Sequence, residues 1–354
     1  MQETENAQKG ILVRQGGMLT VLQDLGRYQY RQYGMPTAGA MDQFSYRVGN
    51  LLVENPENYA SLEITLIGPD LLFQKESMVA ITGAPMKPQL NGREIPMWQS
   101  IPVCKGDVIS FAELETGCRS YMAVAGGFDL PPVMGSLSTY LRAGIGGYQG
   151  RQLKQGDLLP LTRETGGEQG SIRYRYPEHL IPPYPAAQVL RVVLGPQQNF
   201  FTAASIRTFL NSEFEIDSTS DRMGCRLNGP TLKHRHKAEI LSDGLIPGSV
   251  QVPGHGNPIV MLSDCPTSGG YPKIATVISA DLPKIGQLKP GDRLAFQRVS
   301  LKAAHSAYKV FQDSISKDLL EKIPDEHSLP AESRVYQVII EGKTFRVQIK
   351  KENT

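Results

Sequence analysis

Cysteine is scarce in this sequence, and neither sign of charge is in large excess. The chain has 4 cysteines in 354 residues, at positions 104, 118, 225 and 265, and no two of them form a C-x-x-C pair. A disulfide scaffold is therefore excluded, and we expect reduced thiols and a cytoplasmic location. Lysine and arginine total 37, against 35 aspartates and glutamates. Because nucleic-acid binders carry a concentrated basic surplus, we expect no nucleic-acid partner.

Long apolar runs are absent, and so are the usual nucleotide-binding and hydrolase motifs. No stretch approaches the ~20 apolar residues that cross a bilayer, so we expect no membrane partner. Residues 1–5 lack the basic and apolar regions of a signal peptide. No G-x-x-x-x-G-K-[ST] or G-x-S-x-G motif occurs, and the glycines of 144–150 miss the G-x-G-x-x-G register. A standard P-loop, a nucleophile elbow and a Rossmann site are therefore not expected.

Glycine and proline, in contrast, are abundant, with 35 and 25 residues. Such a density of turn formers favours a mainly β fold over a helical one. The two halves also share a pattern of glycine landmarks. Gly68-Pro69 and Gly229-Pro230 are 161 residues apart, as are Gly83 and Gly244. Gly106-Asp107 and Gly291-Asp292 are 185 apart, so a duplicated second copy would carry 24 additional residues. The pattern predicts tandem β-rich domains.

The chain length and local composition predict the following boundaries. We expect an N-terminal β-rich domain, a linker with few core-forming residues, a second β-rich domain, and a tail with a helix and a β-hairpin, at 10–162, 163–187, 188–300 and 301–354. Helical spacing of apolar residues predicts three helices, at 40–53, 198–210 and 303–323. Alternating residues around a Glu-Gly-Lys turn predict a hairpin at 335–350.

Residues 251–272 are the most informative stretch for chemistry. An apolar strand, Ile259–Leu262, lies between two polar loops rich in glycine, which expose backbone N–H groups to a ligand. Asp264 could accept a proton or hold a metal, while Thr267 and Ser268 could bind phosphate or carboxylate oxygens. The alternative is that both loops are simple turns and that Asp264 caps one of them.

Three other polar residues are candidates for a role in binding, catalysis or helix capping. Arg222 could grip a carboxylate or phosphate in a bidentate manner, or form a surface ion pair with the adjacent Asp221. His255, between two glycines, is the histidine we consider as a general base or orienting donor. Asp42 lies at the start of the first expected helix, where capping is a better explanation than catalysis.

An ordered set of motifs resembles the KipA/PxpC family, also called allophanate hydrolase subunit 2. This family is related to part of the carboxyltransferase domain of urea carboxylase. The resemblance spans about residues 10–300, and Ser268 stands where threonine is usual. The motifs are Gln23-Asp24-Leu25-Gly26-Arg27, Gly39-Ala40-Met41-Asp42, Gly68-Pro69, Thr82-Gly83-Ala84, Ala125-Gly126-Gly127, Gly135-Ser136-Leu137-Ser138-Thr139, Asp221-Arg222-Met223-Gly224, Gln251-Val252-Pro253 and Thr267-Ser268-Gly269-Gly270-Tyr271-Pro272.

The resemblance implies a fold, an activity and partners. It implies at least one cyclophilin-like β-barrel, expected at 188–300, and ATP-dependent opening of 5-oxoproline to glutamate. It also implies a KipI/PxpB-type partner and a PxpA-type partner. The lactam is stable, so its carbonyl must be activated, for example as a phosphorylated imidate, before water attacks. Such a site needs donors for oxyanion and phosphate and a carboxylate acceptor. We expect ATP and Mg²⁺, and no covalent biotin on this chain.

We therefore assign two sets of candidate residues. The catalytic set is Asp264, Arg222 and His255. The substrate- or phosphate-binding set is Gln251, Thr267, Ser268, Gly269, Gly270, Tyr271, Arg27 and Ser138. Residues for a metal are not assigned. Two alternatives stay open, namely carboxyl transfer from a separate biotin carrier and a non-catalytic regulator that binds KipI.

Overall fold

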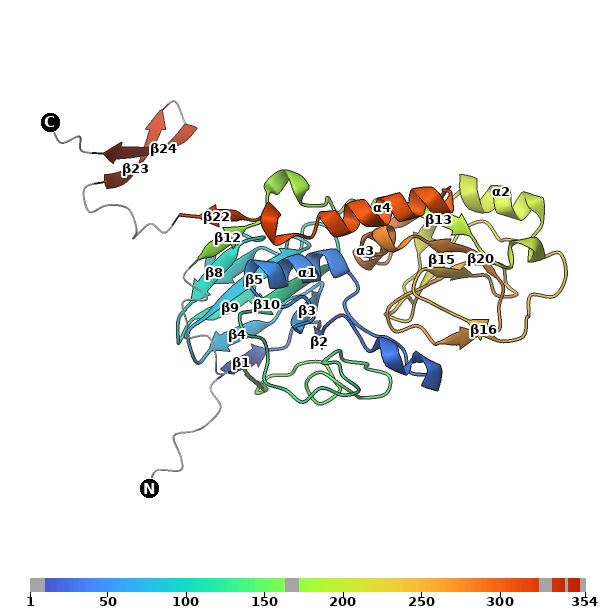
Figure 1. Cartoon of the computed structure of the whole chain (residues 1–354), viewed down its shortest axis with the longest axis horizontal. Coiled ribbons are helices and arrows are strands. Elements are labelled where there is room, and N and C mark those ends of the chain that lie inside the picture. Colours follow the sequence, from blue (N-terminus) through green and yellow to red (C-terminus); the bar gives the residue numbers. More distant parts are fainter. Residues whose placement is uncertain (1–9, 163–171, 325–332, 341–342, 351–354) are drawn as a thin grey trace, which may run out of the picture.

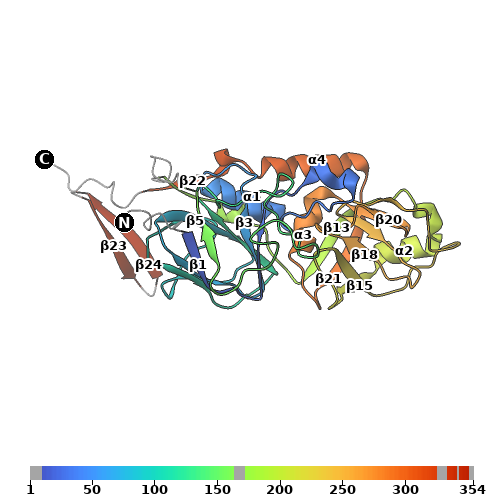
Figure 2. The same cartoon turned by 90° about the horizontal axis from the view of Figure 1, so that it is seen from below.

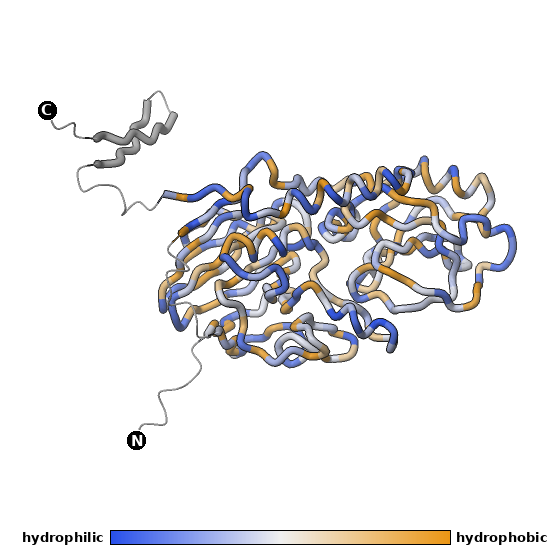
Figure 3. Tube along the Cα trace, in the orientation of Figure 1, coloured by the Kyte–Doolittle hydropathy of each residue, from blue (hydrophilic) through white to orange (hydrophobic). Residues whose placement is uncertain are grey.

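The computed structural model describes residues 10–162, 172–324, 333–340 and 343–350. Two β-rich units lie end to end along the long axis of the molecule (Figures 1 and 2). One helix, α4 (Leu301–Asp313), runs across both units and contacts the first strand of the second unit. Hydrophobic and hydrophilic residues alternate along α4 (Figure 3), as expected for a helix with one face on the protein.

The N-terminal unit is a pair of antiparallel sheets. The six-stranded sheet has the order β11 (Leu158–Pro160), β1 (Gly10–Gln15), β4 (Asp70–Phe73), β9 (Val108–Phe111), β6 (Pro88–Leu90), β7 (Arg93–Glu94). The five-stranded sheet has the order β2 (Leu19–Gln23), β3 (Ser61–Thr65), β10 (Arg119–Val124), β5 (Ser77–Gly83), β8 (Ser100–Val103). Alternating apolar side chains from both sheets, such as Ile11, Leu62 and Phe73, form one buried core between them.

Helix α1 (Gln43–Leu52) covers the other face of the five-stranded sheet. The side chain of Asp42 accepts a hydrogen bond from the backbone N–H of Ser45, so the expected cap is confirmed. Gly49 allows close approach, because a Cβ there would lie 3.1 Å from Oγ1 of Thr82 on β5. The helix and its cap thereby fix the position of the segment before it, residues 39–42.

The second unit is a closed seven-stranded barrel. Its strand order is β13 (Ala187–Leu194), β20 (Lys273–Val277), β17 (Ser249–Gln251), β18 (Ile259–Met261), β15 (Gly224–Asn228), β14 (Glu213–Ile216), β21 (Arg293–Arg298), and the parallel pair β13–β21 closes it. Phe209, Phe214 and Phe296 stack in the core, with Phe209 supplied by α2 (Ala203–Asn211). The expectation of a mainly β fold with a barrel is confirmed.

The remaining elements are short. Helix α3 (Leu282–Gly286) has its C-terminal end against the N-terminal unit. Two small antiparallel ladders are also present. One pairs β16 (Asp243–Gly244) with β19 (Ser268–Gly269), and the other pairs β12 (Arg173–Arg175) with β22 (Glu321–Ile323). The described ranges also contain the 3₁₀ turns η1 (Tyr28–Tyr33), η2 (Glu178–Leu180), η3 (Gln198–Phe200), η4 (Ser279–Asp281) and η5 (Lys317–Leu319). The expected C-terminal hairpin is present as the antiparallel pair β23 (Ser333–Ile340) and β24 (Lys343–Lys350). Within the described ranges, no helix is long and apolar enough to cross a membrane.

Two sequence-based expectations about local structure are wrong. The expected linker contributes to a core, because Tyr174 and Tyr176 are buried against α1 and Trp98, while residues 163–171 lie outside the described ranges. The expected third helix ends at Asp313 and not at residue 323. After the helix, Ile315 packs into the core that contains Tyr174 and Tyr176, and β22 pairs with β12. In both segments, burial of separate aromatic and apolar residues in a core outweighed the local sequence pattern that predicted a linker or a longer helix.

The glycine landmarks match in only one of the three pairs. Gly106 and Gly291 both have positive φ and both precede a strand. Gly68 precedes β4, whereas Gly229 follows β15. Gly83 and Gly244 each end a strand, but Gly83 has positive φ and ends β5 of the five-stranded sheet, whereas Gly244 does not and ends the two-residue β16 outside the barrel. The proposed internal repeat therefore does not describe how the two units are built.

The two units meet through backbone contacts and a shared glutamine. Gln287 Nε2 donates to Asp42 Oδ2 at 2.7 Å and to the carbonyl of Arg119 at 2.9 Å, and its Oε1 accepts from the N–H of Arg119 at 2.9 Å. The preceding Gly286 leaves no room for a side chain, because a Cβ there would lie 2.5 Å from the carbonyl oxygen of Met41. The junction therefore depends on a close fit between α3 and residues 41–42.

We expect Gly286→Ala to destabilise the protein by about 1–3 kcal/mol, because overpacking against a rigid backbone outweighs the ~1 kcal/mol that alanine gains over glycine in a helix. Urea unfolding followed by circular dichroism measures the change. The control is Gly244→Ala, where a Cβ has no neighbour within 4 Å and φ is not positive. Equal stability of the two variants would contradict the close fit.

Candidate functional site

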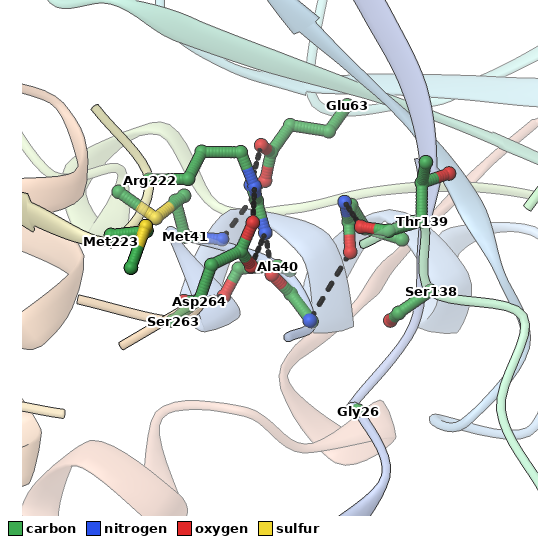
Figure 4. Close-up of polar contacts among 12 residues, drawn as sticks. Gly26, Ala40, Met41, Glu63, Ser138, Thr139, Arg222, Met223, Ser263 and Asp264 are labelled. Atoms are coloured by element: carbon green, nitrogen blue, oxygen red, sulfur yellow. Dashed lines mark hydrogen bonds and ion pairs between the residues drawn. The ribbon is translucent and has the colours of Figure 1, made fainter. Parts of the chain in front are cut away.

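A buried arginine joins the two units. Arg222 lies just before β15 of the barrel and is 5% exposed. Its Nε and Nη2 donate to the two carboxylate oxygens of Asp264 at 3.1 and 3.0 Å, and Nη2 also donates to the carbonyl of Gly39 at 2.6 Å. Its Nη1 donates to Glu63 on β3 of the N-terminal unit. Figure 4 shows the guanidinium between the two carboxylates. The alternative of a surface pair with Asp221 is therefore wrong.

Glu63 extends this network into the N-terminal unit. Its Oε2 accepts from the N–H of Met41 at 2.9 Å and from the hydroxyl of Tyr121 at 2.8 Å. The same hydroxyl accepts from the N–H of Asp42 at 2.8 Å. We did not identify Glu63 from the sequence. The sequence shows only a single acid in the segment Ser61–Thr65, and it is the structure that shows all five residues of this strand to be buried.

The electrostatics of the pair follow from burial and charge. Burial alone would lower the pKa of Arg222, but the charges of Asp264 and Glu63 raise it above its ordinary value. Burial raises the pKa of Asp264, and the cation of Arg222 opposes this shift only in part. Arg222 is therefore a permanent cation, and Asp264 binds a proton more readily than an exposed aspartate does.

A cavity of about 560 Å³ opens onto this ion pair. Arg222 and Asp264 line it, together with Tyr140, the exposed Arg142 and the half-buried Lys289. Burial raises the pKa of Tyr140, and the charge of Asp264 adds to this shift. The cavity thus combines two acidic side chains, Asp221 and the buried Asp264, with a larger number of basic ones, an arrangement suited to a small anion.

Two further candidates from the sequence lie near Asp264. Arg27 is 2% exposed, and its Nη2 donates to the carbonyl of Ser138. Burial lowers the pKa of Arg27, while the charges of Asp24 and Asp264 act in the opposite direction. The structure therefore brings Asp264, Arg222, Arg27 and Ser138 into one region at the junction.

Gln23 and Gly39 belong to the same region and were missed as site residues. Gln23 Nε2 donates to the carbonyl of Thr139 at 3.0 Å, and its Oε1 accepts from the N–H of Gly39 at 3.2 Å. Gln23 thereby ties the segment after Ser138 to the residue whose carbonyl binds Arg222. Both residues occur in the glycine motifs noted above, but neither carries a charge that would single it out.

The other binding candidates form a separate group. Gln251 Nε2 donates to the carbonyl of Tyr271 at 3.1 Å and packs against Gly269. Ser268 and Gly269 form β19, and backbone carbonyls of Thr267 and Gly270 accept hydrogen bonds from nearby loops. None of these residues lines the junction cavity. The segment 251–272, expected to form one site, is therefore divided between two places.

His255 stands apart from both groups. It is exposed, and its Nδ1 accepts from the N–H of Asn257 at 3.2 Å within its own turn. It does not line the junction cavity. Among the described residues, no group of three or more histidine, cysteine, aspartate or glutamate side chains could hold a metal. All four cysteines are free thiols, as expected.

We expect Arg222→Met to destabilise the protein by about 3–5 kcal/mol, because it leaves the buried Asp264 without a cation and Glu63 with only the more distant Arg119, at 3.8 Å. Adding Glu63→Gln should restore part of that loss, since one of the two carboxylate charges is then removed. Urea unfolding of the wild type, both single variants and the double variant measures the coupling. Strictly additive losses would show that Glu63 and Arg222 act independently.

Comparisons with known proteins agree with this architecture. Residues 33–298 match the family described as "Carboxyltransferase domain, subdomain A and B". The 5-oxoprolinase C subunit of Escherichia coli K12 is 40% identical over 291 residues, which are 82% of this chain and 92% of that protein. The corresponding protein of Haemophilus influenzae, also a 5-oxoprolinase C subunit, is 36% identical, over 86% of this chain and 96% of that protein.

A solved structure extends the likeness to a larger enzyme. The Kluyveromyces lactis urea carboxylase superposes with a TM-score of 0.83 at 28% identity, covering 99% of this chain and 33% of that chain. Because the family match covers most of the sequence and the relatives match over nearly their whole length, the chain belongs to the carboxyltransferase domain family, subdomains A and B.

Proposed function

We propose that the chain is the C subunit of a 5-oxoprolinase, which opens 5-oxo-L-proline to L-glutamate. The observation that carries this proposal is the 40% identity over 92% of the Escherichia coli 5-oxoprolinase C subunit. In the reaction, the lactam C–N bond breaks and water supplies the oxygen added to the carbonyl carbon. We further propose that ATP is hydrolysed to ADP and phosphate in the same cycle, which offsets the stability of the ring.

The junction cavity supports this chemistry. Its volume of about 560 Å³ is ample for a five-membered ring, and Arg142 supplies positive charge for an anionic substrate. Lys289 also lines the cavity, but it forms an ion pair with Asp292 at 3.3 Å. Asp264 lines the cavity and has a raised pKa, which suits a general base that takes a proton from the attacking water. In this proposal Arg222 is a positioning residue, because its donors already bind Asp264, Glu63 and Gly39.

Partners and ATP belong to the same proposal. Since the sequence has no standard P-loop, we propose that two further proteins, one of the KipI/PxpB type and one of the PxpA type, complete the enzyme and share in ATP binding. Mg²⁺ would accompany the ATP phosphates, and no step proposed here depends on a metal held by this chain alone. The free thiols support a reducing, cytoplasmic location.

A second function has one specific observation in its favour. The Kluyveromyces lactis urea carboxylase structure superposes on 99% of this chain with a TM-score of 0.83. Carboxyl transfer from a biotin carrier on another chain is therefore the alternative. It would use the same junction cavity with a different acceptor.

We expect the chain mixed with its two partner proteins to release glutamate from 5-oxoproline only when ATP is present. Glutamate and ADP, measured together, should form in equal amounts. The chain alone is the control and should be inactive. Carboxybiotin turnover in place of glutamate release would support the alternative, and tight partner binding with neither activity would indicate a regulator.

We expect Asp264→Asn to lower kcat by at least about 100-fold with little change in KM, because the amide cannot accept a proton. In the wild type, kcat should fall as the pH drops through the raised pKa of Asp264, above the ~3.9 of an ordinary aspartate. That acid limb should be absent from the variant. Glu63→Gln, which removes the other carboxylate partner of Arg222, is the matched control and should lose less than about 10-fold. Equal losses in both variants would reduce Asp264 to a structural role.

A further inference from the structure

Arg27 carries a buried guanidinium that is only partly satisfied. The residue is 2% exposed, and its Nη2 donates to the carbonyl of Ser138. Its Nε and Nη1 have no hydrogen-bond partner in the described part of the chain. Of the five N–H donors of a guanidinium, the three on these two nitrogens are therefore unused. A buried cation with unused donors is costly to fold and calls for an anionic partner.

The nearby carboxylates are committed to other donors. Asp24 accepts from the N–H of Gly26 at 2.7 Å, from the hydroxyl of Ser136 at 2.7 Å and from the N–H of Leu137 at 2.6 Å. Both oxygens of Asp264 bind Arg222. The two carboxylates act on Arg27 through space, yet burial still outweighs them and lowers its pKa. The protein thus buries the guanidinium of Arg27 but leaves part of its hydrogen-bonding capacity unused.

The neighbours of Arg27 line two cavities at the junction. The N–H of Arg27 donates to the carbonyl of Thr37 at 2.8 Å, and Thr37 lines a second cavity of about 320 Å³. Ser263, which precedes Asp264, lines that same cavity. Asp264 itself lines the larger one. Arg27 itself lines neither cavity, but its backbone partner Thr37 lines the smaller one.

Arg27 belongs to the loop of residues 26–39, which begins and ends at a glycine. Gly26 and Gly39 have φ of 96° and 95°, and a Cβ on Gly26 would lie 2.6 Å from the carbonyl of Thr37. Arg31, in the middle of the loop, donates to Thr37 Oγ1 at 2.9 Å and to the carbonyl of Leu245 on the barrel. Because the guanidinium is enclosed, an anion reaches it only when the surrounding loop moves.

We propose that Arg27 binds the carboxylate of the small anionic substrate, an inference that rests on the proposed 5-oxoprolinase function. A guanidinium forms charge-assisted hydrogen bonds to a carboxylate, and its planar fork favours that group over a neutral one. The two buried arginines then have different tasks. Arg222 joins the units and positions Asp264, whereas Arg27 recognises the substrate.

The test compares two ligands that differ only in the carboxylate, namely 5-oxoproline and 2-pyrrolidinone. Titration calorimetry on the full chain measures the affinity for each, and KM and kcat are measured on the complex with the partner proteins. The variants are Arg27→Met and Arg27→Lys. The matched control is Arg31→Met, which removes a cation from the same loop whose donors are bonded within the protein.

We expect the wild type to favour 5-oxoproline, and Arg27→Met to lose about 10- to 100-fold of that preference, the range of one charge-assisted hydrogen-bond pair. The loss should lie in KM more than in kcat, Arg27→Lys should keep part of the preference, and Arg31→Met should keep all of it. Thermal unfolding should show a smaller loss of stability for Arg27→Met than for Arg222→Met, since only the latter removes the shared cation of two carboxylates.

An unchanged ligand preference in Arg27→Met, with turnover retained, would overturn this inference and leave the proposed function standing. If Arg27→Met does not fold, equal wild-type affinity for the two ligands overturns it instead. Absence of glutamate release by the wild-type complex would overturn both. Inorganic phosphate is titrated as a third ligand. Loss of phosphate binding in Arg27→Met, with 5-oxoproline binding unchanged, would exclude the assignment of Arg27 to the substrate carboxylate.

Discussion

The ion pairs of Arg222 are the constraint on which the rest of the molecule depends. A guanidinium from the barrel binds a carboxylate of its own unit, Asp264, and one of the other unit, Glu63, with all three side chains buried. Removing Arg222 would leave two buried carboxylates without their shared cation in a low-dielectric interior. The two units are therefore held in one relative position, and the cavity between them keeps its shape. A carboxylate held at such a junction needs little reorganisation when a ligand binds.

The same arrangement explains why the functional groups come from distant parts of the chain. β3 supplies Glu63, the segment after β18 supplies Asp264, and the loops beside α1 and Ser138 supply backbone oxygens. No single loop contains the site. The two sheets and the barrel act as rigid supports, and the chemistry sits where they meet, as is common for ligand sites at domain interfaces. The likeness to carboxyltransferase domains fits a fold that can host more than one reaction at this junction.

Some of this was predictable from the sequence because the signals were local. Turn density indicated a mainly β fold, the spacing before residue 43 indicated the Asp42 cap, and the charge chemistry of Asp264 and Arg222 singled out two candidates that the structure brings together. Glu63 was not predictable, because its partner lies 159 residues away and a strand pattern does not say which acid pairs with which base. Tyr174 and Tyr176 were misassigned to a linker for the same reason, since only tertiary packing buries them. The division of residues 251–272 between two places likewise depends on the β16–β19 ladder, which no local pattern indicated.

The central claim is that substrate binds in the junction cavity, beside Asp264. A crystal structure of the assembled complex with bound 5-oxoproline tests this claim most directly. The account predicts ligand density between the two units, in contact with residues that line the cavity with Asp264. Density confined to the group around Gln251 and Tyr271, or to a partner protein, would contradict it.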